Sequence, residues 1–258
     1  MSLRNKKSLG QHWLYDRVVL AKIADSGELS SNDTVLEIGP GLGTLTSELL
    51  RRSGKVIAIE LDSNLARKLP GQFPGKNLEV INTDFLNYDL SKLPPSYKVV
   101  ANVPYYITGK IIQKLMTTEN KPSIIVLLVQ KEVAERAAAK PGDMSILSVS
   151  TQVFAEVSLG EIVPAKLFTP PPKVDSQIVI MRILPKLLLD GVDEKSFFRI
   201  IKAGFSAKRK KLRSSLAGGL GISKTEAENF LEQSGIDPNS RAENLAVSDW
   251  LNLVNIIN

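Results

Sequence analysis

The residues between about 30 and 130 alternate short runs rich in β-branched side chains with stretches of helical pattern. The runs that predict strands are T-V-L-E-I at 34–38, V-I-A-I-E at 56–60, L-E-V-I-N at 78–82, K-V-V-A-N at 98–102 and S-I-I-V-L-L-V at 123–129. Such alternation indicates βαβ units, and nearly continuous apolar strands are expected where helices cover both faces of a sheet. The sequence therefore predicts an α/β fold with a parallel, doubly wound sheet.

The rest of the chain predicts two more strands and then a change of class. Runs at about 146–160 and 176–184 resemble strands, and beyond them the pattern becomes helical. The predicted helices are 194–205, 207–216, 223–233 and 247–257. We expect two domains, an α/β domain with an N-terminal arm over residues 1–187 and a small all-helical domain over residues 188–258.

Composition excludes several chemistries. The 258 residues contain no Cys and a single His, so there is no disulfide, no Cys nucleophile, no thiolate zinc site and no His-rich metal centre. The longest apolar run, 124–129, is far shorter than the ~20 residues of a membrane-spanning helix, and the opening M-S-L-R-N-K-K lacks the apolar stretch of a signal peptide. We expect a cytoplasmic protein without a metal.

The formal net charge of +6 is unevenly distributed along the chain. Residues 1–22 carry five basic and one acidic side chain, and residues 181–218 carry ten basic and three acidic ones. Residues 23–180 are almost neutral, and residues 219–258 are acidic. The excess positive charge thus lies in an N-terminal arm and in one segment near the far end, a pattern that permits a polyanionic partner.

A glycine-rich turn follows the first predicted strand. The segment E-I-G-P-G-L-G at 37–43 leads into a helical pattern, where glycines allow a tight turn and a close approach of a ligand to the backbone. The dinucleotide fingerprint would require Gly at position 44, which is Thr44 here. A strand-to-helix turn without a ligand is the alternative interpretation.

With Glu60 at the end of the next strand, this glycine pattern resembles class I S-adenosylmethionine methyltransferases. The resemblance implies that S-adenosylmethionine is the cofactor and that Glu60 accepts hydrogen bonds from its ribose hydroxyls. Asp84, after the third strand, would accept the adenine amine with Phe85 beside the ring. The implied cofactor-binding set also includes Gly39, Gly41 and Leu61.

The tetrapeptide N-V-P-Y at 102–105 ends the fourth strand and looks like the N-x-P-Y motif of amino-methyltransferases. An exocyclic adenine amine is a poor nucleophile until two hydrogen-bond acceptors favour its pyramidal form. The side-chain oxygen of Asn102 and the carbonyl of Val103, held by Pro104, supply such a pair, and Tyr105 stacks on the flipped base. The alternative is an ordinary proline turn after a buried strand.

Three further segments extend the resemblance along nearly the whole chain. K-K-S-L-G-Q-H-W-L at 6–14, F-T-P-P-P-K-V-D-S at 168–176 and F-S-A-K-R-K-K-L-R at 205–213 are similar to segments of the rRNA adenine dimethyltransferases of the bacterial small-subunit type. Trp13, Val103 and Tyr106 depart from the residues usual in that family. None of the three changes removes a proposed polar contact, but they alter the expected shape of the target pocket.

The family resemblance assigns roles to three more residues. His12 and Leu14 of the arm would contact the cofactor together with Asn102, and Phe168 would stack on the target base opposite Tyr105. Packing in the core is the alternative for Phe168, and a surface or structural role is the alternative for His12. Nothing orients His12 as a general base, so we assign it cofactor contact and not proton transfer.

Basic side chains concentrate where the resemblance implies contact with RNA. The expected RNA-binding residues are Arg4, Lys6, Lys7, Lys208, Arg209, Lys210, Lys211 and Arg213. Contacts with phosphates would supply affinity without reading sequence, and the shape of the RNA would select the adenine. A solvated charged face is the alternative.

The resemblance implies an S-adenosylmethionine-dependent enzyme, a monomer, that dimethylates two adjacent adenines near the 3′ end of small-subunit rRNA and acts in late subunit biogenesis. Two alternatives stay open. One is a methylase of large-subunit rRNA of the macrolide-resistance type, and the other is a ribosome-assembly factor that acts mainly by binding. The basic segment at 205–213 favours the first interpretation.

Overall fold

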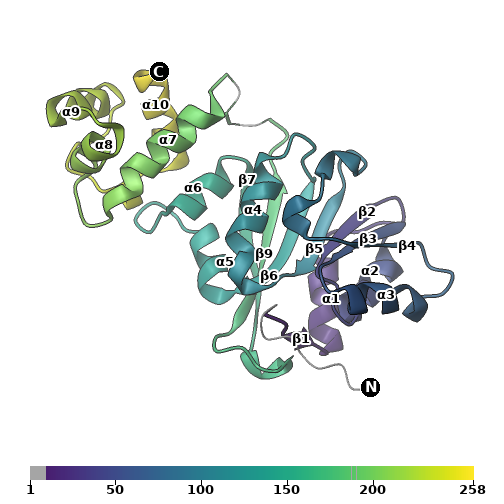
Figure 1. Ribbon diagram of the computed structural model, residues 1–258. Helices are drawn as coiled ribbons and strands as arrows, with labels where there is room; N and C mark the ends of the chain where they lie inside the picture. Colours follow the sequence, from purple (N-terminus) through teal and green to yellow (C-terminus); the bar gives the residue numbers. More distant parts are fainter. Residues whose placement is uncertain (1–9, 187, 190) are drawn as a thin grey trace. The chain divides into compact units, whose positions relative to one another are not determined.

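The computed structural model describes residues 10–186, 188–189 and 191–258, and the chain forms two compact units. The first unit comprises Met1–Ala134 and Val157–Ile183, and the second comprises Glu135–Glu156 and Leu184–Asn258. A β-sheet flanked by helices makes up the first unit, and helices make up most of the second (Figure 1).

A seven-stranded sheet forms the centre of the first unit (Figure 1). Its spatial order is β4 (Leu78–Asn82), β3 (Lys55–Glu60), β2 (Thr34–Ile38), β5 (Lys98–Asn102), β6 (Ile124–Gln130), β9 (Ser176–Ile183) and β7 (Ala155–Val163). The first five strands are parallel, and the five strands predicted for them are confirmed. The prediction of an all-parallel sheet is wrong, because β9 runs antiparallel to β6. The segment between β7 and β9 contains no α-helix, whereas a parallel pair of strands is usually joined by one.

Helices cover both faces of this sheet. Helices α1 (Arg17–Asp25) and α2 (Thr44–Arg52) contribute apolar side chains to a core that also contains alternate residues of the strands, among them Leu20, Ile23, Leu45, Leu49, Val35, Val56, Val100 and Val126. Successive strand residues point to opposite faces, so the equally buried Leu36 and Val99 face the other side, where α4 (Thr108–Thr117) lies (Figure 1). Two shorter helices, α3 (Ser63–Lys68) and α5 (Lys131–Ala137), follow β3 and β6.

The strand predicted for about 146–160 is partly wrong. Residues Ile146–Gln152 form helix α6, and only the later part of the segment belongs to β7. The helix starts at a reciprocal cap: the hydroxyl of Ser145 accepts from the N–H of Ser148, and the hydroxyl of Ser148 accepts from the N–H of Ser145. These bonds satisfy backbone donors that a helix start leaves unpaired, so the segment becomes a helix despite its β-branched residues.

A second, two-stranded sheet anchors the N-terminal arm. Strand β1 (Trp13–Leu14) pairs antiparallel with β8 (Phe168–Thr169), so that Trp13 lies opposite Thr169 and Leu14 opposite Phe168. Leu14 and Phe168 are 1% and 2% exposed and belong to the same core as α1 and α2. This pairing fixes residues 12–14 beside the carboxyl ends of the central strands.

The second unit contains α6 and four longer helices: α7 (Glu194–Gly204), α8 (Leu212–Leu220), α9 (Lys224–Gln233) and α10 (Val247–Ile257). Three of the four predicted helices are confirmed, but the helix predicted for 207–216 begins only at Leu212. Lys211 has extended backbone angles, and the N–H of Leu212 donates to the carbonyl of Ser240 at 2.8 Å. The basic residues 208–211 therefore form a turn. In the part of the chain that the structure describes, no helix is long and apolar enough to cross a membrane.

Candidate functional site

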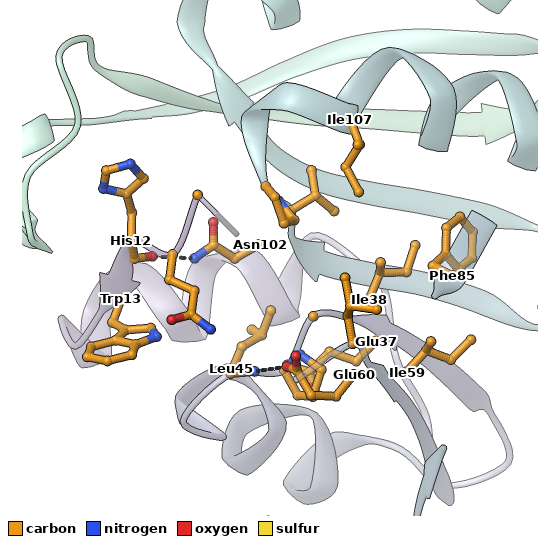
Figure 2. A pocket seen from close by; sticks show the side chains of 18 of the residues that line it. His12, Trp13, Glu37, Ile38, Leu45, Ile59, Glu60, Phe85, Asn102 and Ile107 are labelled. Carbon is orange, nitrogen blue, oxygen red and sulfur yellow. Dashed lines mark hydrogen bonds between the residues drawn. The ribbon is translucent and has the colours of Figure 1, made fainter. Parts of the chain in front are cut away.

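A pocket lies at the carboxyl ends of β2, β3 and β5, which is where open α/β sheets bind ligands. All nine residues predicted to bind the cofactor line it: His12, Leu14, Gly39, Gly41, Glu60, Leu61, Asp84, Phe85 and Asn102. Val103, Pro104 and Tyr105 line it as well. Figure 2 shows the pocket with His12, Trp13 and Asn102 at one side and Glu37, Glu60 and Phe85 across from them.

The glycine turn between β2 and α2 shapes the floor of the pocket. Gly39, Gly41 and Gly43 have φ of +69°, +57° and +81°, a left-handed conformation that side chains disfavour. A Cβ on Gly43 would lie 2.7 Å from Cδ1 of Leu69, so a larger residue there would force a neighbour to shift. A Cβ on Gly39 would lie 3.8 Å from Cδ of Pro104, so the glycine turn and the 102–105 segment are neighbours.

Glu60 ends β3 with its carboxylate fixed by the backbone. It accepts from the N–H of Gly41 at 3.0 Å and from the N–H of Asp62 at 2.8 Å, and it is 5% exposed. Burial raises the pKa of Glu60 above its ordinary value, although these hydrogen bonds act in the opposite direction. Each carboxylate oxygen can accept more than one hydrogen bond, so this geometry leaves acceptor capacity for a hydroxyl-bearing ligand.

Glu37 is a second buried carboxyl group in the lining, and it was not among the predicted site residues. It is 1% exposed and accepts a hydrogen bond from the hydroxyl of Thr46 at 2.6 Å. Burial raises the pKa of Glu37 to about 8, and the neighbouring Glu60 contributes in the same direction. The only signal in the sequence was the acidic side chain two positions before Gly39, the first glycine of the motif.

Asp84 and Phe85 follow β4 in a short turn. One carboxylate oxygen of Asp84 accepts from the N–H of Leu86 at 2.8 Å, which fixes the side chain at the pocket wall. Phe85 is 4% exposed, and Nζ of Lys114 lies 5.4 Å from its ring centroid. The ring is thus a packed wall of the pocket.

Residues 102–105 form the wall that faces the N-terminal arm. The Nδ2 of Asn102 donates to the carbonyl oxygen of His12 in a long hydrogen bond of 3.5 Å. Val103 is 2% exposed, and the hydroxyls of Tyr105 and Ser176 are hydrogen-bonded at 2.6 Å. Burial raises the pKa of Tyr105, so its hydroxyl stays protonated at neutral pH.

His12 stacks on Tyr105, with ring centroids 5.7 Å apart and 18° between the ring planes. Nδ1 of His12 lies 2.7 Å from the carbonyl oxygen of Pro170. A carbonyl only accepts, so this geometry assigns a proton to Nδ1. Trp13 of the arm and Tyr106, which follows the 102–105 segment, also line the pocket, and the sequence marked both only as departures from the family pattern.

Phe168 does not line this pocket. Its side chain is buried in the core with Leu14, as the alternative interpretation of the sequence has it. The pairing of β8 with β1 places Phe168 opposite Leu14. A base-stacking role for Phe168 opposite Tyr105 stays a prediction.

The predicted RNA-binding residues of the second unit lie in the turn before α8. Lys208, Arg209, Lys210 and Lys211 are exposed, and Nζ of Lys211 donates to Asn239 at 2.7 Å. Arg213 differs from them, because it forms an ion pair with Glu228 of α9 and is only partly exposed. Arg4, Lys6 and Lys7 lie outside the described residues.

The pocket is acidic. Among the described residues, its lining contains the carboxyl groups of Glu37, Glu60 and Asp84 and no Lys or Arg. Such a lining suits a ligand with several hydrogen-bond donors. No three His, Cys, Asp or Glu side chains of the described part of the chain gather in a metal-binding cluster.

Curated proteins resemble this chain over nearly its full length. A ribosomal RNA small subunit methyltransferase A of Dehalococcoides mccartyi (strain CBDB1) is 44% identical over 256 residues, which cover 98% of this chain and 88% of that protein. The protein of the same name from Nostoc sp. (strain PCC 7120) is 41% identical over 271 residues, covering 99% of this chain and 98% of the other.

Two solved structures share the fold. A dimethyladenosine transferase from Plasmodium falciparum superposes with a TM-score of 0.81 at 30% identity, over 94% of this chain and 96% of that one. The 23S rRNA methyltransferase ErmE superposes with a TM-score of 0.77, also at 30% identity, over 95% and 98% of the two chains. The central sheet and its helices therefore form a class I methyltransferase fold.

A family model described as ribosomal RNA adenine dimethylase matches residues 2–258. The match includes the glycine turn, the acidic strand ends and the 102–105 segment that together form the pocket. The chain belongs to the ribosomal RNA adenine dimethylase family.

Proposed function

We propose that this protein uses S-adenosylmethionine to dimethylate the exocyclic amines of two adjacent adenosines near the 3′ end of small-subunit rRNA. One observation carries the proposal: the Asn102–Tyr105 segment and the carboxylate of Glu60 line the same pocket, so methyl acceptor and cofactor can bind side by side. The names of the relatives, which are small-subunit methyltransferases at 41% and 44% identity, support the choice of substrate.

The pocket fits the proposed cofactor. S-adenosylmethionine supplies a sulfonium methyl group, which is the group to be transferred. Glu60, already fixed by two backbone N–H groups, would accept the ribose hydroxyls, and Asp84 would accept the adenine amine, with Phe85 beside the ring. Gly39 and Gly41 let the backbone approach the ligand, and Leu14 and Leu61 belong to the lining.

Asn102 would accept a hydrogen bond from the target amine through its side-chain oxygen. Its Nδ2 is directed to the carbonyl of His12, so the amide is oriented with its oxygen available for another donor. The carbonyl of Val103, in the backbone restricted by Pro104, would be the second acceptor. Two acceptors favour the pyramidal amine, which directs the nitrogen lone pair at the methyl group.

Tyr105 would stack on the flipped adenine. Its hydroxyl is held by Ser176 and its ring by His12, so the side chain is positioned before RNA arrives. Proton loss from the methylated amine, which is a cation, needs no tuned base, since water or a nearby carbonyl suffices. His12 therefore forms a wall of the site, and its Nδ1–H donates to the carbonyl oxygen of Pro170.

The basic turn at 208–211 and the arm residues Arg4, Lys6 and Lys7 would bind rRNA phosphates. In this proposal residues 1–187 carry catalysis and residues 188–258 bind rRNA, and the protein acts as a cytoplasmic monomer late in small-subunit assembly. Such contacts position the RNA, and the unpaired adenosines that reach the pocket are selected by its shape.

The proposal is tested with labelled S-adenosylmethionine and three substrates from an unmethylated strain: small subunits, large subunits and duplex DNA. We expect label in small subunits alone. Label only in large subunits would assign the protein to the type of ErmE, to which it is 30% identical. Tight binding to small subunits without any label would identify an assembly factor.

A further inference from the structure

Trp13 carries a hydrogen-bond donor that has no partner. Among the described residues, four buried side-chain polar atoms lack a hydrogen bond: Nε1 of Trp13, the hydroxyl of Tyr97, Oε1 of Gln177 and Nε1 of Trp250. Of these four residues only Trp13 lines the cofactor pocket. Buried donors are nearly always paired, so an unpaired donor in a binding site indicates a ligand atom that pairs with it.

The indole is held against the glycine turn. A Cβ on Gly41 would lie 3.6 Å from both Cδ1 and Nε1 of Trp13, which places the N–H edge of the ring beside this glycine. The backbone of Trp13 is fixed by its pairing with Thr169 in the two-stranded sheet. Figure 2 shows the nitrogen on the side of the ring that faces the middle of the pocket.

The glycine turn does not itself offer its glycine amides to a ligand. The N–H of Gly39 donates to the carbonyl of Ile59, that of Gly41 to the carboxylate of Glu60, and that of Gly43 to the carbonyl of Pro40. The described lining also holds no Lys or Arg. An anionic group of a ligand at this turn therefore finds no Lys or Arg in the described lining, and the Nε1–H of Trp13 is one of the neutral donors there.

The proposed cofactor has one anionic group, the carboxylate of its amino-acid tail. We propose that Nε1–H of Trp13 donates a hydrogen bond to this carboxylate and so determines the affinity for S-adenosylmethionine. The inference rests on the proposed function, because it takes S-adenosylmethionine as the ligand. Trp13 is a binding residue in this account and takes no part in methyl transfer.

The test compares Trp13→Phe with the wild type, since Phe keeps an aromatic ring on Gly41 and removes the N–H. Calorimetric titrations use two ligands, S-adenosylmethionine and its decarboxylated form, which keeps the sulfonium and the ammonium. We expect the Kd for S-adenosylmethionine to rise about 10-fold in Trp13→Phe, which is about 1.4 kcal/mol. The Kd for the decarboxylated ligand should change less than about 2-fold, because that ligand lacks the acceptor.

Trp250→Phe is the matched control. It also removes a buried indole N–H without a partner, but Trp250 lies in α10 and does not line the pocket. We expect its Kd for both ligands to equal that of the wild type. The thermal unfolding of each unliganded variant is measured alongside, so that a loss of affinity is attributed only to folded protein.

Two results would overturn the inference: an unchanged Kd for S-adenosylmethionine in Trp13→Phe, or the same weakening for both ligands, which would show that ring volume and not the carboxylate contact matters. Neither result affects the proposed function, which would fail only if the wild type bound no S-adenosylmethionine or transferred no methyl group to small subunits.

Discussion

The side-chain amide of Asn102, at the end of β5, donates to the main-chain carbonyl of His12, 90 residues earlier in the chain. The arm is itself fixed, because Trp13 and Leu14 pair with β8. Two segments far apart in the sequence thus orient one amide group, and its oxygen remains for the target amine.

Asn102→Ala removes the proposed acceptor. We expect the methylation rate to fall about 10²- to 10³-fold, in line with the loss of other preorganised hydrogen-bond groups, while the affinity for small subunits changes less than about 2-fold. Single-turnover assays and subunit pelleting measure the two quantities. Asn64→Ala, an exposed position on α3, is the control and should behave as the wild type. Equal rates for Asn102→Ala and the control would eliminate the acceptor mechanism.

Glu37 makes the stability of the unliganded protein dependent on pH. Its pKa is about 8 in the folded protein against the ordinary value of 4.5, so the folded state retains a proton that the unfolded chain has lost. The stabilisation that protonated Glu37 contributes to the folded state is complete below about pH 4.5 and is lost as the pH rises through 8. The free energy of unfolding falls by at most ~1.4 kcal/mol per pH unit over this range.

Glu37→Gln stays neutral and can still accept from Thr46, so it should lack this decline. Urea unfolding at pH 5, 6, 7 and 8 gives the free energy of unfolding of both proteins. The wild type should lose stability relative to Glu37→Gln with each step. Parallel curves for the two proteins would contradict the raised pKa.

The exposed turn before α8 should control the electrostatic part of rRNA binding. Replacing Lys208, Arg209 and Lys210 together by Ala is expected to weaken binding to small subunits and to make the dependence of log K on log salt shallower by about 2. The Kd for S-adenosylmethionine should stay the same, because the first unit alone lines the pocket. Lys224→Ala, exposed on α9, is the control. An unchanged salt dependence would show that this turn does not contact phosphates.

Substitution of Gly43 tests how closely the glycine turn packs against its neighbours. A methyl group there would lie 2.7 Å from Cδ1 of Leu69, at a φ of +81°. Gly43→Ala should therefore lower the free energy of unfolding by about 1–3 kcal/mol, measured by urea titration. In Gly71→Ala the added Cβ would have no atom of another part of the chain within 4 Å, so this variant should change the free energy of unfolding by less than ~0.5 kcal/mol. Equal stabilities of the two variants would contradict the close packing at Gly43.

Much of the fold could be predicted because its strands are buried on both faces. The run 124–129 is wholly apolar, which a central strand requires, and the glycine motif marks the turn after β2. Residues 146–152 contain the β-branched Ile146, Val149 and Thr151, but the Ser145 cap starts a helix there. The capping geometry, which depends on two hydroxyl groups three residues apart, outweighs the β-branched composition.

Site residues at the ends of strands could be predicted from the sequence. Residues whose surroundings depend on tertiary packing could not. Glu60 and Asn102 end β3 and β5, so the topology places them at one edge of the sheet. The burial of Phe168 could not be predicted, because Phe168 pairs with Leu14 of β1, about 150 residues away. The orphan N–H of Trp13 is likewise a property of three-dimensional packing.

The proposed dimethylation of small-subunit rRNA is tested by locating the methylated adenosines. Small subunits from an unmethylated strain are incubated with the protein and S-adenosylmethionine, and their rRNA is analysed by nucleoside mass spectrometry and by reverse transcription. We expect N6,N6-dimethyladenosine at two adjacent adenosines near the 3′ end of the small-subunit rRNA. Dimethyladenosine found only in large-subunit rRNA, in a parallel reaction with large subunits, would contradict the proposal.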